Sequence, residues 1–211
     1  MKEQGTNVKR IGITGGIGSG KTEACKILER LGEKVLYADL IAKELTDNND
    51  AIKNEIKNVF GLEFFDKSGK LNRKKLAGLV FSDDEALSVL NYIIHPHVFA
   101  AIDDEVAKLA KNGGNRIFVE AALIFEACMD SNLDLVIVID AEKETRLKRV
   151  TSRDGMTESE FNKRVNSQIS SEERVKLADF TIKNNGSVEE LERNLTFIVS
   201  LINNFKIDRN D

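Results

Sequence analysis

The stretch that decides the fold is Gly15-Gly16-Ile17-Gly18-Ser19-Gly20-Lys21-Thr22, which fits the pattern G-x-x-x-x-G-K-[ST] in full. An apolar run over residues 9–14 precedes it, and an amphipathic stretch over residues 22–31 follows it. Strand, glycine-rich loop and helix in this order are typical of a phosphate-binding loop. Glycines let backbone N–H groups wrap closely around phosphate oxygens, and the following helix N-terminus adds a positive dipole. The sequence therefore predicts a site for a nucleoside triphosphate.

Two side chains at the end of this loop have expected roles. Lys21 can reach the β- and γ-phosphates, and the Thr22 hydroxyl can ligate magnesium. The alternative, a glycine-rich turn ahead of an ordinary helix, is disfavoured because the full pattern occurs between a predicted strand and a predicted helix. The backbone around the phosphates is then supplied by Gly15, Gly16, Gly18, Ser19 and Gly20. The motif does not indicate which reaction the nucleotide undergoes.

Composition excludes several classes of protein. The 211 residues include 31 Lys+Arg and 35 Asp+Glu, a net charge of -4, which argues against nucleic acid or an anionic membrane as the main partner. Apolar runs such as 121–125 and 135–139 are too short to span a bilayer, and residues 1–10 lack the apolar stretch of a signal peptide. We expect a cytoplasmic protein in which Cys25 and Cys128 are reduced thiols.

Short apolar runs alternate along the chain with longer amphipathic stretches. This alternation predicts an α/β fold with a parallel sheet of about five strands. A helix is expected over residues 22–31, ending before Gly32. The expected strands are residues 9–14, 35–38, 117–124, 133–139 and 180–182.

Two long segments interrupt this alternation. The gap between the second and third expected strands far exceeds a βαβ crossover, which takes about 30 residues in all, and predicts an inserted helical subdomain. A second insertion is rich in Arg and Glu and predicts a lid. The expected boundaries are 8–40, 114–141 and 177–204 for the nucleotide-binding core, 41–113 for the helical insertion and 142–176 for the lid.

Asp39 follows the second expected strand directly. Ligands of open α/β sheets bind at the carboxyl ends of the strands, so this carboxylate could accept a proton from an attacking hydroxyl or hold magnesium through water. Asp is also a favoured N-cap, and a helix is expected to start near Leu40. The sequence leaves both interpretations open.

The predicted lid contains a group of arginines. Arg146, Arg149 and Arg153 are spaced i, i+3, i+7 and can share one helix face, and Arg164 follows. The planar guanidinium suits phosphate binding, and one well-placed arginine contributes strongly to phosphoryl transfer. For each arginine taken alone, a solvated helix with glutamate partners remains the alternative.

Both histidines of the chain, His95 and His97, flank its one proline, Pro96. No third metal ligand lies nearby in the sequence. We expect Pro96 to separate two helices or to open the second one. For His95, a buried or capping side chain and a substrate contact both remain open.

Several further segments follow the phosphate-binding motif in a fixed order. Together with the motif they are IGITGGIGSGKT at 11–22, YADLIAKEL at 37–45, LNRKKLAGLVFSD at 71–83, LNYIIHPHV at 90–98, ALIFEA at 122–127, RLKRVTSRDGMTESEF at 146–161, Gln168 and ADFTIKNNG at 178–186. In this order, from about Arg10 to Gly186, they resemble the dephospho-CoA kinase family. Glu120 and Ala122 stand where that family usually has aspartate and proline, and Phe99 stands near a position that is often arginine.

The resemblance implies transfer of the γ-phosphoryl of ATP to the ribose 3′-hydroxyl of dephospho-CoA, with Mg²⁺. It also implies a three-layer P-loop kinase fold with a helical substrate domain and an Arg-rich lid. The chain would act on a small molecule as a monomer or small homo-oligomer, without nucleic acid or membrane. The residues that match the family are Asp39 as general base and substrate contact, Lys21 and Thr22 at phosphate and magnesium, Arg149 in the lid, Arg73 and His95 in the substrate domain, and Asn184 near the adenine.

Three other classes of protein are alternatives to a dephospho-CoA kinase. A different small-molecule or nucleoside monophosphate kinase would share the core and differ in its acceptor. A GTP-binding switch protein would need an N-K-x-D segment, which is absent, and the D-x-x-G match at 66–69 lies in a polar turn. A purely structural domain leaves the phosphate loop unexplained.

Overall fold

A computed structural model describes residues 8–80 and 82–204 of the chain. Its centre is a five-stranded sheet in the order β2-β3-β1-β4-β5, and β1 pairs in parallel with both β3 and β4, as β4 does with β5. The predicted α/β class with a parallel sheet is confirmed. The strands are β1 Lys9–Thr14, β2 Val35–Tyr37, β3 Arg116–Glu120, β4 Leu135–Asp140 and β5 Phe180–Lys183.

Helices make up most of the remaining described chain. The α-helices are α1 Lys21–Arg30, α2 Ala38–Asn48, α3 Asp50–Phe60, α4 Arg73–Val80, α5 Asp84–Lys111, α6 Lys143–Asp154, α7 Glu158–Asn166, α8 Ser171–Leu177 and α9 Val188–Asn204. Two short 3₁₀ helices are η1 Leu62–Phe64 and η2 Met129–Asn132. Among the described residues, no helix is long and apolar enough to cross a membrane.

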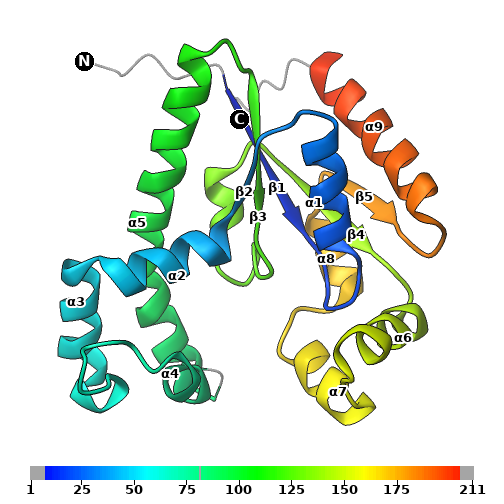
Figure 1. The fold of residues 1–211 in the computed structure, drawn as a ribbon. Helices are drawn as coiled ribbons and strands as arrows, with labels where there is room; N and C mark the ends of the chain where they lie inside the picture. Colours follow the sequence, from blue (N-terminus) through cyan, green and yellow to red (C-terminus); the bar gives the residue numbers. More distant parts are fainter. Residues whose placement is uncertain (1–7, 81, 205–211) are drawn as a thin grey trace. The chain divides into compact units, whose positions relative to one another are not determined.

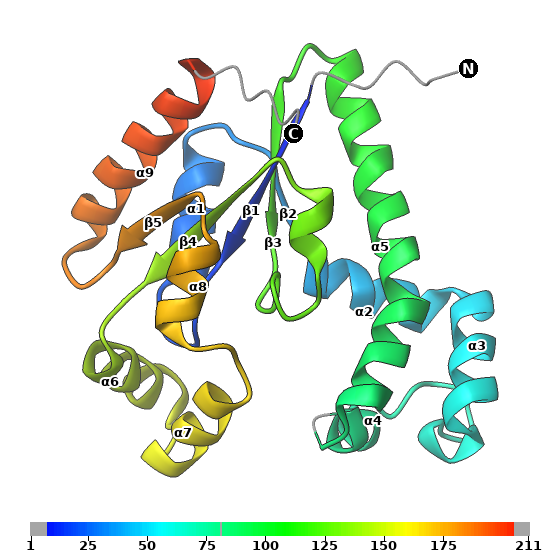
Figure 2. The same ribbon diagram turned by 180° about the vertical axis from the view of Figure 1, so that it is seen from behind.

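The chain divides into two compact units. The first comprises the described residues of Met1–Leu36 and Leu109–Asp211, and the second is Tyr37–Lys108. In the first unit, α1 and α9 cover one face of the sheet and α8 covers the other (Figures 1 and 2). Strand β4, which lies between β1 and β5, is buried along its whole length, because it is covered on both faces. This layering leaves the carboxyl ends of β1 and β4 free to carry loops.

The second unit has its own apolar core, built from α2, α3, α4 and the part of α5 up to Lys108. Asn49 begins α3 by accepting hydrogen bonds from the backbone of Ala51 (2.9 Å) and Ile52 (3.3 Å). The buried members of the core are Ile52, Ile56, Phe64, Leu71, Leu76, Val80 and Ile93.

Two local expectations were wrong. Pro96 does not separate two helices, since α5 runs through it without a break. The expected strand over 117–124 ends as β3 at Glu120, and the chain then turns. Ile124 is nevertheless fully buried, so its apolar character reflects packing in a turn and not strand pairing.

The segment predicted as a lid folds into α6, α7 and α8. α6 and α7 share a small apolar cluster of Val150, Met156 and Phe161, against which Ile17 of the phosphate loop packs. Thr157 starts α7 with a capping box, because its hydroxyl accepts from the Glu160 amide while the Glu160 carboxylate accepts from the Thr157 amide. The packing of Ile17 joins the segment to the phosphate loop.

Candidate active site

The phosphate loop connects β1 to α1, as its sequence predicts. Gly18 (φ 78°) and Gly20 (φ 102°) have left-handed backbone conformations that side chains rarely adopt, and Gly20 is the N-cap of α1. The amide of Ser19 donates to the Gly16 carbonyl at 3.1 Å and closes the turn. Lys21 donates from Nζ to the Gly15 carbonyl at 2.7 Å. Thr22 is exposed on the first turn of α1.

Two side chains that are distant from the loop in the sequence contact it at the carbonyl oxygen of Ser19. Asn184, buried just after β5, donates to this oxygen from Nδ2 at 2.8 Å, and Arg149 of α6 approaches it from Nη1 at 3.4 Å. A Cβ atom at Gly20 would lie 2.2 Å from Asn184 Nδ2, so glycine is required there by space as well as by backbone angle. The structure therefore brings together Lys21, Arg149 and Asn184 around one loop.

Two buried arginines lie against Gly16. Arg146 is 7% exposed and Arg174 is 2% exposed. A Cβ atom on Gly16 would stand 2.6 Å from Nη1 of Arg146 and 3.3 Å from Nη1 of Arg174. The alternative of a solvated helix is thus wrong for Arg146. It holds for Arg153, whose exposed guanidinium pairs with Asp154 at 2.6 Å.

The described residues leave three buried side-chain atoms without a hydrogen-bond partner: Ser19 Oγ, Arg146 Nε and Arg174 Nε. All three belong to the loop or to the two arginines that lie against it. Buried polar groups are normally satisfied, and unpaired buried charge is costly. An anion bound in the loop would supply acceptors and balance the positive charge, so these residues fit the phosphates of a nucleotide.

Two carboxylates, those of Asp140 and Glu126, interact with the arginine pair. Asp140, buried at the end of β4, accepts from Ser171 Oγ at 2.5 Å and from Lys183 Nζ. Burial opposes the ionisation of Asp140, but the hydrogen bonds from Lys183 and Ser171 outweigh it and hold its pKa below the ordinary value. Glu126 lies 3.8 Å from Arg174. Asp140 interacts electrostatically with Arg146, and both Asp140 and Glu126 do so with Arg174.

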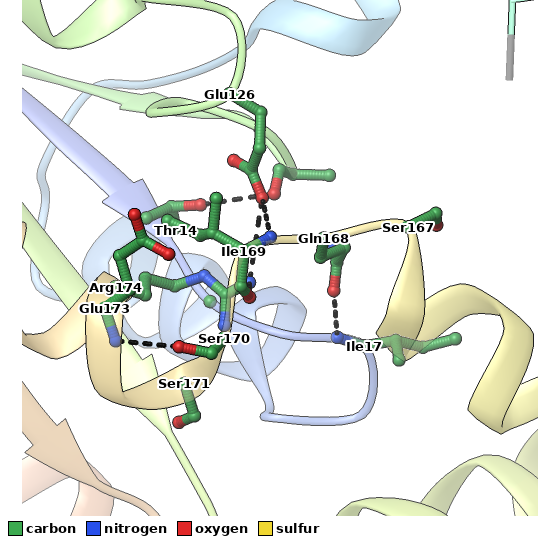
Figure 3. A network of polar contacts seen from close by, with 12 residues as sticks. Thr14, Ile17, Glu126, Ser167, Gln168, Ile169, Ser170, Ser171, Glu173 and Arg174 are labelled. Atoms are coloured by element: carbon green, nitrogen blue, oxygen red, sulfur yellow. Dashed lines mark hydrogen bonds and ion pairs between the residues drawn. The ribbon is translucent and has the colours of Figure 1, made fainter. Parts of the chain in front are cut away.

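A network of polar contacts ties the loop to the segment between α7 and α8 (Figure 3). The side-chain carbonyl of Gln168 accepts from the Ile17 amide at 3.3 Å. Glu126 accepts from the Ile169 amide at 3.0 Å, and Arg174 donates to the Ile169 carbonyl at 2.9 Å. The backbone of the phosphate loop is thus hydrogen-bonded to a residue between α7 and α8, far away in the sequence.

Asp39 lies in the second unit, in the first turn of α2. It is not the helix cap, because α2 begins at Ala38 with Tyr37 as N-cap and no side chain accepts a capping hydrogen bond. The Asp39 side chain is exposed. In the sheet order, β2 is separated from β1 by β3.

Two further predicted site residues also belong to the second unit. Arg73 donates to Asp47 Oδ1 (2.7 Å), to the Lys43 carbonyl (2.7 Å) and to the Thr46 hydroxyl, so it holds the C-terminal turns of α2. His95 is half-buried in α5 and meets Phe99 edge-on at 5.9 Å, and burial lowers its pKa. His95 is therefore a poor candidate for a cation at neutral pH.

Sequence reasoning missed Arg174, quoted Glu126 only within a longer segment, and named Gln168 without giving it a role. The pattern Ser170-x-x-Glu173 signals a helix start, and Ser170 does cap α8. That signal places Arg174 in the first turns of a short helix. Its burial has no signature in a single sequence, because charged residues are normally exposed.

Comparison with known proteins assigns the chain to a family. The sequence profile of dephospho-CoA kinase matches residues 9–190, which include the phosphate loop, Arg174 and Asn184. The chain belongs to the dephospho-CoA kinase family. The predicted resemblance and the predicted class of enzyme, a kinase, are thereby confirmed.

Individual proteins that are similar to this chain support the assignment. The dephospho-CoA kinase of Salinibacter ruber is 38% identical over 183 residues, 87% of this chain and 92% of that protein. A solved structure of dephospho-CoA kinase from Campylobacter jejuni is 34% identical with a TM-score of 0.66, covering 93% of this chain and 98% of that one. The crystal structure of TT1252 from Thermus thermophilus gives 33% identity, a TM-score of 0.79, and coverage of 92% and 98%.

Proposed function

We propose that this chain transfers the γ-phosphoryl group of ATP to the ribose 3′-hydroxyl of dephospho-CoA, giving coenzyme A as the last step of its biosynthesis. The observation that supports this most directly is the match of the dephospho-CoA kinase profile over residues 9–190. The unpartnered polar atoms at Ser19, Arg146 and Arg174 support a polyanionic ligand at the loop. We place the reaction in the cytoplasm, where such a soluble substrate would be made.

The nucleotide's phosphates would bind in the loop formed by residues 15–22. Backbone N–H groups and the N-terminus of α1 attract the phosphate oxygens. Lys21 would stabilise the β- and γ-phosphates, and Arg149 would approach the group being transferred. Asn184 would lie near the nucleotide at the end of β5, in keeping with its hydrogen bond to the Ser19 carbonyl.

Magnesium fits this site as a partner of the phosphates. The described residues contain no group of three or more His, Cys, Asp or Glu side chains that could hold a metal ion. Mg²⁺ in kinases is bound by one or two protein ligands together with substrate phosphates and water, so the Thr22 hydroxyl suffices as the loop's contribution. The ion would neutralise charge that develops on the phosphate oxygens.

Asp39 would serve as the general base. Its side chain is exposed and makes no capping hydrogen bond, so it is available to a substrate hydroxyl. A positioned base contributes about 10²- to 10⁴-fold to the rate. The acceptor would bind to the helical insertion of residues 41–113, where Arg73 and His95 lie, and residues 142–176 would form the lid that excludes water.

A related kinase that acts on a different acceptor, such as a nucleoside monophosphate, is the alternative. The deciding experiment incubates the protein with ATP, Mg²⁺ and dephospho-CoA and identifies the product by mass. We expect dephospho-CoA to gain one phosphate in a magnesium-dependent reaction that Lys21→Ala abolishes without loss of fold. Phosphorylation of adenosine or AMP in preference to dephospho-CoA would overturn the assignment of the acceptor.

A further inference from the structure

We propose that Arg174 is a positioning residue for phosphoryl transfer, which holds the segment 167–170, here called the connector, against the phosphate loop. The expected change in KM for ATP rests on the proposed function. The expected change in hydrogen exchange of the Ile17 amide does not. The connector joins α7 to α8, and Arg174 projects back onto it from α8 (Figure 3). In this role Arg174 acts on the loop through Ile169 of the connector, separately from any contact that its unpartnered Nε makes with a bound anion.

The connector is held at consecutive residues. The Oε1 of Gln168 accepts a hydrogen bond from the Ile17 amide of the phosphate loop at 3.3 Å. The next residue, Ile169, has both backbone groups engaged: its amide donates to Glu126 and its carbonyl accepts from Arg174. Because Gln168 and Ile169 are neighbours, any shift at Ile169 moves the side chain that holds Ile17.

Arg174 contacts the connector and also lies against the phosphate loop. One of its terminal nitrogens, Nη2, donates to Ile169 and lies 3.8 Å from Glu126. The other, Nη1, faces Gly16 of the loop. A planar guanidinium can serve two directions at once, whereas the ammonium of lysine is a single point charge. The fork shape, and not only the charge, is therefore what the position requires.

The environment of Arg174 supports a role beyond a surface ion pair. Its side chain is 3% exposed and that of Glu126 is 16% exposed. Burial lowers the pKa of Arg174, and Glu126 opposes that shift. Phosphoryl transfer depends on placing donors accurately around the transferred group, and displacements of about 1 Å can cost 10²-fold in rate. A loop released at Ile17 would place its phosphate-binding groups less accurately, so its hydrogen bonds to the bound nucleotide would weaken and ATP would bind less tightly.

The test compares Arg174→Lys with Arg116→Lys. Arg116, whose side chain is 15% exposed, forms an ion pair with Glu33, through Nε and Oε2 at 2.7 Å, at the start of β3. For Arg174→Lys we expect faster hydrogen exchange of the Ile17 amide, measured by NMR without nucleotide. We also expect KM for ATP to rise about tenfold, the effect of losing roughly one hydrogen bond. Arg116→Lys should lower the melting temperature without either effect.

A second variant keeps the test decisive if Arg174→Lys does not fold. Glu126→Gln retains an acceptor for the Ile169 amide but removes the charge beside Arg174, and should produce the same two effects in weaker form. Unchanged Ile17 exchange and unchanged KM would overturn the proposal. So would equal exchange effects in the Arg116 control, since these would indicate general destabilisation. If the wild-type chain does not phosphorylate dephospho-CoA, the proposed function fails, and calorimetric ATP affinity together with Ile17 exchange still decides the role of Arg174.

Discussion

Asn184 donates a buried hydrogen bond from Nδ2 to the carbonyl oxygen of Ser19 at 2.8 Å, across 165 positions of sequence. Its own amide donates to the Asp140 carbonyl at 2.7 Å. The residue therefore connects the ends of β4 and β5 to the phosphate loop. The loop of this kinase is shaped by the sheet edge as well as by its own glycines.

Replacing Asn184 should disturb nucleotide binding more than folding. In Asn184→Asp, a carboxylate replaces the donor and faces the Ser19 carbonyl without a proton to share. We expect KM for ATP to rise about tenfold, because a buried acceptor loses its partner. Steady-state kinetics at varied ATP measures this. Asn185→Asp is the matched control, since the exposed Asn185 contacts only Glu142 in its side-chain hydrogen bonds; equal effects in both variants would contradict the prediction.

Gly16→Ala should displace the arginine pair. The added Cβ would stand 2.6 Å from Nη1 of Arg146, so that guanidinium must move. We expect ATP affinity, measured by calorimetry, to fall by about tenfold or more, in line with losing one charged hydrogen bond. Gly78→Ala in α4 is the control, because a Cβ there meets nothing within 4 Å and alanine favours helix. Unchanged affinity in Gly16→Ala would show that the arginines do not contribute.

Asp39→Asn should separate catalysis from stability. Asp39 is exposed and makes no capping bond, so its effect on folding is limited to the helix dipole, about 0.3–1 kcal/mol. As a general base, its loss should lower kcat by about 10²-fold or more with little change in KM for ATP. The experiment measures kcat and the melting temperature together. A large fall in melting temperature with near-normal kcat would assign Asp39 to α2 instead.

The sequence predicted the sheet and the loop because their signals are local. The motif at residues 15–22 and the apolar strands β1 and β4 act through neighbouring residues, and the structure has them in the predicted places. The resemblance also identified the family. Local signals were insufficient where packing decides: Pro96 continues a helix, and Ile124 is buried in a turn.

Long-range contacts were beyond the sequence for the same reason. Nothing near Gln168 in the chain indicates that it accepts from Ile17, and nothing near Arg174 indicates its burial. These pairs meet only because the sheet order places β1 beside β4 and brings α8 onto one face. In the second unit, the sequence predicted Arg73 as a substrate contact. In the structure, its guanidinium already donates hydrogen bonds to Asp47 and to the Lys43 carbonyl of α2.

Arg73→Ala should destabilise the protein. The variant removes the bonds to Asp47 and to the Lys43 carbonyl, and we expect a loss of about 1–2 kcal/mol in the free energy of unfolding, because the pair is partly exposed. Urea denaturation measures it. Lys74→Ala, on the same helix and exposed, is the control. A normal unfolding free energy with a raised KM for dephospho-CoA would instead make Arg73 a substrate contact.

The same pair gives a dependence on pH. The hydrogen bond from Arg73 holds the pKa of Asp47 below its ordinary value. A depressed carboxyl pKa contributes stability above the unfolded value, near 4, and loses it as pH falls through the folded value. The difference in unfolding free energy between wild type and Arg73→Ala should therefore shrink below about pH 4. An undiminished difference at low pH would exclude Asp47 as the partner that matters.

The two cysteines should differ in reactivity, which tests the packing behind the loop. Cys25 is fully buried in α1, and burial raises the pKa of its thiol to about 12, with Glu120 adding to the shift. Cys128 is exposed. The thiolate is the reactive form, so at pH 8 a thiol reagent should modify Cys128 quickly and Cys25 only after denaturation. Mass spectrometry of the modified peptides identifies the site. Rapid modification of Cys25 in the folded protein would mean that α1 does not pack on the sheet as described, and would remove the support on which the phosphate loop rests.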